Sequence, residues 1–265
     1  MDTRSALLAT LRYWRACGID RLTGEAWGWH QPALKLPAAP VSRLSVPVVP
    51  EVVPVLPTPT VEPAPVSLDR LLTPALPLEA RLTLLAERAE RVAGCQACAL
   101  ALTRRRVVYG VGPADAVVVW IVDAPGEADE SKGMAFAGEG RELFEGMLRG
   151  VGLGRHEVYV THLVKCRPPG DRAPRGDEVR LCQGYWIEEL ETIRPKAIVA
   201  LGKAVVETLL GDVGRLTKAR GQVHVWRGIP VIATYHPSYC LRAPLSKRAL
   251  WEDVLLLKKR LMEIG

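Results

Sequence analysis

Apolar residues recur in two alternating patterns from about residue 78 onward. Short continuous runs such as AVVVWIVD (116–123) and KAIVALG (196–202) are typical of strands buried on both faces. Segments such as DEVRLCQGYWIEELETI (177–193) instead repeat at helical spacing. Because buried strands separated by helices need cover on both faces, the pattern predicts an α/β fold with a parallel sheet between helices.

The loops after the predicted strands hold most of the unusual residues. Strands are predicted over 116–123, 157–164, 196–202 and 229–237, and helices over 78–95, 140–153, 177–193, 203–211 and 246–261. The loops at the strand ends read DAPGEADE, THLVKCRPPG, LGKA and YHPSYCLR. Ligands of such sheets bind at the carboxyl ends of the strands, so we expect the functional site in these four loops.

The amino-terminal part of the chain has a different composition. The sequence predicts a short helical peptide segment over residues 1–31. Residues 32–77 hold 12 of the 21 prolines of the chain. Proline lacks the backbone donor that helices and sheets need, so 32–77 is predicted to be an extended, disordered linker or else an irregular coat on the domain. Residues 78–265 are then predicted to form the folded domain.

Charge and hydropathy narrow the class of protein. The 35 Lys and Arg residues against 29 Asp and Glu give a net charge of +6, which suits a polyanionic partner without requiring one. No segment reaches the roughly 18–20 apolar residues that cross a bilayer, and the start lacks the pattern of an export signal. We therefore expect a cytoplasmic protein with no membrane partner. A monomer is also expected.

Four of the six cysteines have a spacing that suggests metal ligands. Cys95 and Cys98 form a C-x-x-C pair, while Cys166 and Cys182 lie far away in a strand loop and in the helix after it. Four thiolates suit zinc or a 4Fe-4S cluster, and spacing alone does not choose between them. Four ordinary buried cysteines are the alternative.

Four motifs, in this order and spacing, resemble the iron-sulfur uracil-DNA glycosylases of family 4. They are CQACALALTRRRVVYGVG, DAPGEADESKGMAFAGEGRELFEGML, VYVTHLVKCRPP and IPVIATYHPSYCLR, and the resemblance spans about 80–262. It implies a three-layer α/β/α fold with a central four-stranded, mainly parallel sheet. It also implies hydrolysis of the N-glycosidic bond of uracil, or of another deaminated base, in single- or double-stranded DNA. The 4Fe-4S cluster of the family would be structural and held by Cys95, Cys98, Cys166 and Cys182, leaving Cys17 and Cys240 as free thiols.

The resemblance also implies a pocket for an extruded base. Phe136 would stack on the base, and the backbone of Ala124 would contact a uracil carbonyl. Asp123 and Asp129 would place water, although the family usually has glutamate where this chain has Asp123. Phe136 in the core and Asp123 as a turn residue are the alternatives.

The HPS motif adds candidates from the last loop. His236 would stabilise the negative charge that develops on the departing base, as an oxyanion hole does. Leu241 would wedge into the gap left by the base, and Arg242 would hold phosphate. Further phosphate contacts are considered among the basic residues near the loops, which are Lys165, Arg167, Arg172, Arg175, Arg220 and Lys247.

His162 departs from the family, which has asparagine at this position. The amide of asparagine donates to O4 and accepts from N3–H of uracil side by side, whereas the donor and acceptor of a neutral imidazole diverge. We expect weaker or altered base discrimination, unless His162 is only structural.

Two other functional classes stay open. One is a catalytically weak or inactive DNA-binding adaptor coupled to the replication machinery, and the other is a zinc-holding nucleotide-binding protein. The first 30 residues, especially LRYWRACGIDRLTG, are similar to the amino-terminal peptide of the psi subunit of the bacterial polymerase III clamp loader. A docking peptide on a tether would raise the local concentration at a replication partner.

Overall fold

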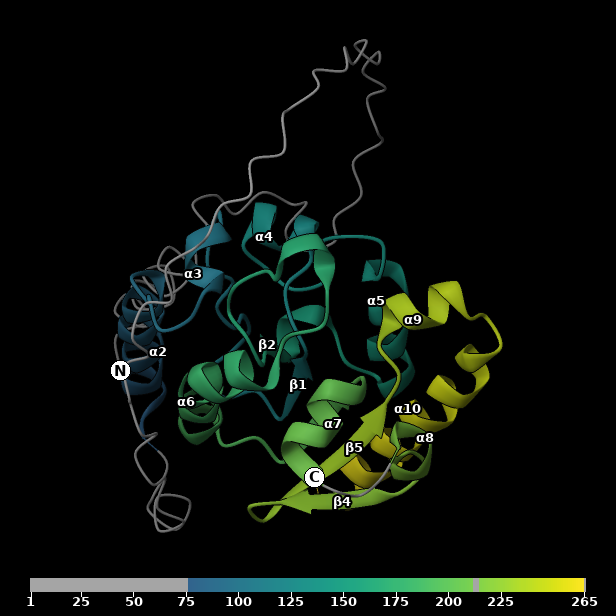
Figure 1. Cartoon of the computed structure of the whole chain (residues 1–265). Coiled ribbons are helices and arrows are strands. Elements are labelled where there is room, and N and C mark those ends of the chain that lie inside the picture. The colour runs from purple at the N-terminus through teal and green to yellow at the C-terminus, as the bar shows by residue number, and fades with distance from the viewer. Residues whose placement is uncertain (1–75, 212–214, 265) are drawn as a thin grey trace, which may run out of the picture.

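The computed structural model describes residues 76–211 and 215–264 (Figure 1). The predicted peptide segment 1–31 and nearly all of the predicted linker 32–77 lie outside the described residues. Their boundaries, the disorder of the linker and the docking role of the first 30 residues therefore stay predictions.

One mixed sheet of five strands forms the centre of the domain. Its strands are β1 (Val118–Val122), β2 (Tyr159–His162), β3 (Ala197–Leu201), β4 (Val223–Trp226) and β5 (Ile229–Thr234). The order is β2-β1-β3-β5-β4, and the first four strands in this order run parallel. These four are the predicted strands, so the parallel core of the sheet is confirmed.

The fifth strand, β4, was not predicted. It pairs antiparallel with β5 at the edge of the sheet, and its residues alternate between exposed and partly buried. The loop between the two strands is Arg227 and Gly228, both with positive φ (46° and 82°), as a two-residue hairpin of type I′ requires. Because β4 is half exposed, it lacks the continuous apolar run that marks the other strands.

Helices cover both faces of the sheet. The helices are α2 (Leu78–Ala93), α3 (Leu100–Thr103), α4 (Glu127–Lys132), α5 (Arg141–Val151), α6 (Gly176–Ile193), α7 (Lys203–Leu210), α8 (Leu216–Ala219), α9 (Pro237–Arg242) and α10 (Ser246–Ile264), with 3₁₀ turns η3 (Arg155–Glu157) and η4 (Pro169–Asp171). The five long predicted helices are confirmed, and the short helices α3, α4, α8 and α9 are additions.

Two hydrophobic cores show why β1 reads as an unbroken apolar run. Val119 and Ile121 face the core shared with α2, α6 and α7, whereas Val118, Trp120 and Val122 face the core shared with α5 and α10. Figure 1 shows α2 and α6 on one side of the domain and α5 and α10 on the other. The predicted three-layer α/β/α architecture is therefore confirmed.

The parallel strands β2, β1, β3 and β5 are neighbours, so the loops at their carboxyl ends meet along one edge of the sheet. Within the described residues, no helix is both long enough and apolar enough to cross a membrane.

Candidate active site

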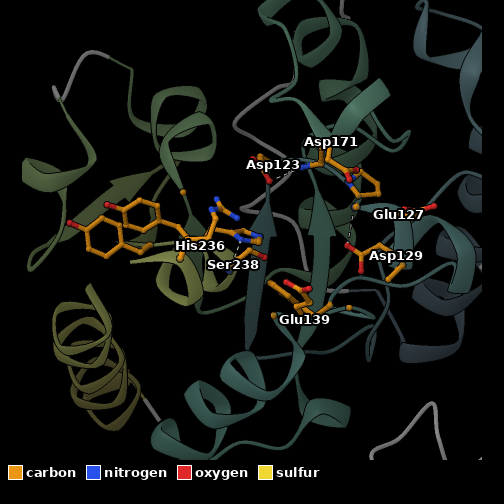
Figure 2. A pocket seen from close by; sticks show the side chains of 18 of the residues that line it. Asp123, Glu127, Asp129, Glu139, Asp171, His236 and Ser238 are labelled. Atoms are coloured by element: carbon orange, nitrogen blue, oxygen red, sulfur yellow. Dashed lines mark hydrogen bonds between the residues drawn. The ribbon is translucent and has the colours of Figure 1, made fainter. Parts of the chain in front are cut away.

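A cleft of about 720 Å³ opens at the carboxyl edge of the sheet. Its walls come from the loop after β1, the loop around Phe136, the start of α7 and the start of α9. Figure 2 shows Asp123, Asp129 and Glu139 around the same cavity as His236 and Ser238. Three of the four loops singled out by the sequence thus contribute to one site. The fourth, 161–170, does not line the cleft, although Asp171 and Arg172 directly after it do.

Asp123 and Ala124 stand at the end of β1 and line the cleft. The Asp123 Oδ1 accepts a hydrogen bond from the Ala124 amide at 2.9 Å. The backbone carbonyl of Asp123 also accepts from the Val164 amide at 3.3 Å, which ties this loop to the segment after β2. The carboxylate is therefore held at the cleft wall by the local turn.

Asp129 lines the cleft from α4, but its carboxylate is committed to the backbone. Oδ2 accepts from the Gly126 amide at 3.2 Å and Oδ1 accepts from the Ala137 amide at 2.8 Å. Burial raises the pKa of Asp129 above its usual range, and the two amides act against that rise. Asp129 thus clamps the loop after β1 to the loop that carries Phe136.

Phe136 adopts a left-handed backbone conformation (φ 57°), which is uncommon for a residue with a bulky side chain. The Asp129 bond to the next residue, Ala137, helps to hold this geometry. The Phe136 ring stacks on Phe144 with centroids 4.0 Å apart and planes at 19°, and it lines the cleft. It therefore packs against the core and also borders the cavity, so the two interpretations of Phe136 do not exclude each other.

His236 caps the start of α9 with its side chain. Its Nδ1 accepts a hydrogen bond from the Ser238 amide at 3.1 Å, so the proton of a neutral ring lies on Nε2. Burial lowers the pKa of His236, and the ring lies 5.7 Å from the Phe136 ring, centroid to centroid. The local structure thus presents a neutral imidazole with one fixed tautomer next to the aromatic wall of the cleft.

His162 ends β2 and is fully enclosed. Neither ring nitrogen has a hydrogen-bond partner among the described residues, and Nε2 lies 3.9 Å from Oδ2 of Asp129. Burial lowers the pKa of His162 well below its usual range, and the charges of Lys165 and His236 add to this. His162 is therefore a neutral ring behind Asp129 rather than part of the exposed wall.

The DNA-binding candidates fall into two groups. Arg242 is exposed and lines the cleft, whereas Leu241 is exposed beside it and is absent from the cleft wall in the described structure. The expectation that Lys165 contacts phosphate is wrong, because its side chain is 1% exposed and paired with Glu189. Arg220 is likewise held inside, paired with Asp253 at 2.6 Å.

Arg167 and Arg172 are held by acidic partners. The Arg167 Nε lies 2.6 Å from Asp171 Oδ1, and the Arg172 guanidinium bonds both oxygens of Glu178. The positive charge of each guanidinium is therefore already balanced by a carboxylate, so neither is a good candidate for a phosphate contact.

The four candidate metal ligands line one small cavity between α2, α6 and the loop after β2. Burial raises the pKa of Cys98, of Cys166 (to about 11) and of Cys182 (to about 12). Over 76–211 and 215–264, no three His, Cys, Asp or Glu side chains are arranged so that they could hold a metal ion. The sulfurs thus share a cavity without converging on one point.

Hydrogen-bond donors approach these sulfurs. An Arg104 Nη donates to Cys166 Sγ at 3.5 Å, and the Lys165 amide donates to Cys182 Sγ at 3.4 Å. Sequence reasoning missed both contacts, although the basic run at 104–106 follows the C-x-x-C pair closely. Donors of this kind stabilise thiolates and are typical of the surroundings of metal-bound sulfur.

Comparison with known proteins agrees with this geometry. The family model described as "Uracil DNA glycosylase superfamily" matches residues 109–255. A type-4 uracil-DNA glycosylase of Thermotoga maritima is 37% identical over 180 residues, which cover 66% of this chain and 94% of that protein. One of Saccharolobus solfataricus is 35% identical over 182 residues, which cover 65% and 84%. Since the family model and these relatives span the cleft and its loops, this chain belongs to the uracil-DNA glycosylase superfamily.

Proposed function

We propose that this chain is a DNA-repair glycosylase that hydrolyses the N-glycosidic bond of uracil in DNA. The observation that carries the proposal is the pairing of an aromatic wall, Phe136, with a neutral imidazole donor, His236, in one cleft. The relatives named type-4 uracil-DNA glycosylases support the same substrate. A base extruded from DNA would enter the cleft and stack on Phe136.

The chemistry follows from the tautomer of His236. As the glycosidic bond breaks, negative charge moves onto the ring of the departing uracil, mainly onto its oxygens. A donor already aimed at that position stabilises the charge without reorganisation. Because Nδ1 is occupied by the Ser238 amide, Nε2–H is the group of His236 that serves this role.

Asp123 and Asp129 have different parts in this proposal. Asp129 uses both carboxylate oxygens on backbone amides, so it positions the loops that carry Gly126 and Phe136. Asp123 is the carboxylate that orients the attacking water and stabilises the positive charge that develops on the sugar. Aspartate has a shorter reach than glutamate, and a misplacement of about 1 Å can lower a rate on the order of a hundredfold.

We also propose that the cavity of Cys95, Cys98, Cys166 and Cys182 holds a 4Fe-4S cluster. Such a cluster offers one iron to each sulfur, so its ligands stand farther apart than the ligands of one zinc ion. Four sulfurs around a shared cavity supply the four thiolates that such a cluster takes. When bound, the cluster would crosslink the segment after α2 to the loop after β2 and to α6.

The test uses single- and double-stranded oligonucleotides carrying uracil, hypoxanthine or xanthine, with alkaline cleavage of any abasic site. Strand cleavage at uracil, lost in His236→Ala, supports the proposal. Retained DNA binding without product on any base would overturn it in favour of the adaptor. In that case product from His162→Asn would assign the inactivity to the histidine. Iron content and absorbance at about 400 nm distinguish iron from zinc.

A further inference from the structure

The cleft is larger than a single base requires. Its volume of about 720 Å³ is near the upper part of the range for ligand pockets. The parts assigned above to the extruded base lie around Asp123, Phe136 and His236. The cleft wall also includes four residues that have no role in base excision, namely Lys203, Leu216, Tyr235 and Tyr239, together with the phosphate candidate Arg242.

Tyr239 is the exposed aromatic residue among these. Its side chain is 45% exposed, and it lies on α9 three residues after His236. His236 is the N-cap of α9 and Tyr239 lies in its first turn, and both residues line the same cleft. An exposed ring at the wall of a polar cleft offers a flat apolar face to a ligand.

The ring of Tyr239 is supported from behind by a continuous set of contacts. Tyr235 lies 5.2 Å from Tyr239, centroid to centroid, with the planes at 32°. The Arg220 guanidinium lies 4.4 Å from the centroid of the Tyr235 ring, and its Nε is 2.6 Å from Oδ2 of Asp253. Asp253 is buried in α10 and also accepts from the Gly221 amide at 3.1 Å.

This support matters for binding. A side chain that is already fixed loses less conformational entropy when a ligand packs on it. The Asp253–Arg220–Tyr235 series connects the exposed ring to a core helix, so Tyr239 is built as a rigid surface.

The charges around the cleft identify the ligand class. Carboxylates of Asp123, Glu127 and Asp129 line the cleft, and so do the cations Lys203 and Arg242. Lys203 Nζ lies 3.5 Å from Glu207 Oε1, whereas Arg242 lies three residues after Tyr239 on α9 and so on the same side of the helix. A flat ring with a cation beside it suits a nucleotide, because the base stacks on the ring and the phosphate lies toward the positive charge.

We propose that Tyr239 forms a second nucleobase site, in which a nucleotide next to the extruded one stacks on the ring with its phosphate toward Arg242. The proposal rests on the proposed function, because it assumes DNA in the cleft. A base inside a duplex already has both faces stacked, so it must leave the duplex to use this site. The site therefore favours single-stranded DNA and has little sequence preference.

The experiment measures the binding of a short single-stranded oligonucleotide without uracil, by fluorescence anisotropy. We expect Tyr239→Ala to weaken binding about 5- to 100-fold, as the loss of one stacked base predicts, and Tyr239→Phe to stay within about twofold. The loss should shrink to less than about threefold on a duplex of the same sequence. The control is Leu255→Ala, which removes a similarly exposed apolar side chain (48%) from α10 outside the cleft wall.

Several outcomes would overturn the proposal. They are unchanged binding by Tyr239→Ala, an equal loss in Tyr239→Phe, an equal loss on single strand and duplex, and no single-strand binding by the wild-type protein. Thermal unfolding of each variant shows whether a loss reflects misfolding, and Tyr239→Leu keeps an apolar side chain if alanine unfolds the domain. Uracil excision is assayed separately, so failed excision with a Tyr239-dependent loss of binding would overturn the proposed function and leave this site standing.

Discussion

Lys165 and Glu189 form an ion pair inside the domain, with Nζ 2.7 Å from Oε2 and side chains 1% and 0% exposed. Lys165 Nζ also donates to Thr161 Oγ1, and Glu189 Oε1 accepts from the Gly110 amide and the Tyr159 hydroxyl. The pair ties the end of β2, which carries His162, to α6, which carries Cys182. It therefore connects the strand that carries His162 to the cysteine cavity, which Lys165 itself lines.

Breaking this pair should be costly. Lys165→Met leaves Glu189 as a buried, unpaired charge, so we expect the free energy of unfolding to fall by about 3–5 kcal/mol. In Lys165→Met/Glu189→Gln the charge is gone and the amide can still bond the Gly110 amide and the Tyr159 hydroxyl, so much of the loss should be recovered. Urea unfolding followed by circular dichroism measures both variants. If the double variant is no more stable than the single one, the pair does not behave as an isolated buried ion pair.

Phe136→Leu tests the aromatic wall of the cleft. Leucine keeps an apolar side chain on the Phe144 ring but removes the flat face that stacks on a base. We expect kcat/KM for uracil excision to fall about 5- to 100-fold, with a small change in thermal stability. Single-turnover kinetics on a uracil oligonucleotide provide the measurement. An unchanged kcat/KM would place Phe136 in the core alone.

His162 should make the protein sensitive to acid. Its pKa is lowered well below the usual range by burial, so below about pH 6.5 the unfolded chain binds a proton that the folded chain does not. Stability is then fully present above that pH and falls as the pH drops, by about 1.4 kcal/mol per pH unit for this group. His162→Asn should flatten this part of the profile from pH 6.5 to 5, measured by urea unfolding. An identical slope in the variant would rule out His162 as the source.

The cysteine cavity gives a matched pair of variants. Cys166→Ser should lose most of the iron and the absorbance at about 400 nm, because one ligand of the proposed cluster is replaced. Cys240→Ala removes an equally buried thiol that lies outside the cavity, so iron content should stay at the wild-type level. Metal analysis of freshly purified protein measures the iron content of both variants. Equal iron in both variants would contradict the proposed ligand set.

The parallel core of the sheet was predictable because every residue of β1 and β3 is buried. An unbroken apolar run is then the direct trace of burial on two faces. The edge strand β4 faces solvent on one side, so its sequence does not show this run.

Some residues of the site could likewise be predicted from the sequence, and others could not. Cys95, Cys98, Cys166 and Cys182 were singled out by spacing and by resemblance, and the structure brings them to one cavity. Lys165 could not be recognised, because a lysine at a loop reads as an exposed cation until its buried partner Glu189, 24 residues away, is known. The support of Tyr239 was equally hidden, since it depends on how α10 docks beside β5.

The four cysteines of the cavity come from segments that lie before β1 and after β2 in the sequence. Cys95 and Cys98 precede β1, whereas Cys166 and Cys182 follow β2, so the thiols meet only after these strands are in place. Cys182 is the last of the four to be synthesised, and until then the C-x-x-C pair can close into a disulfide under oxidising conditions. Reducing conditions during expression should therefore favour assembly of the proposed cluster site.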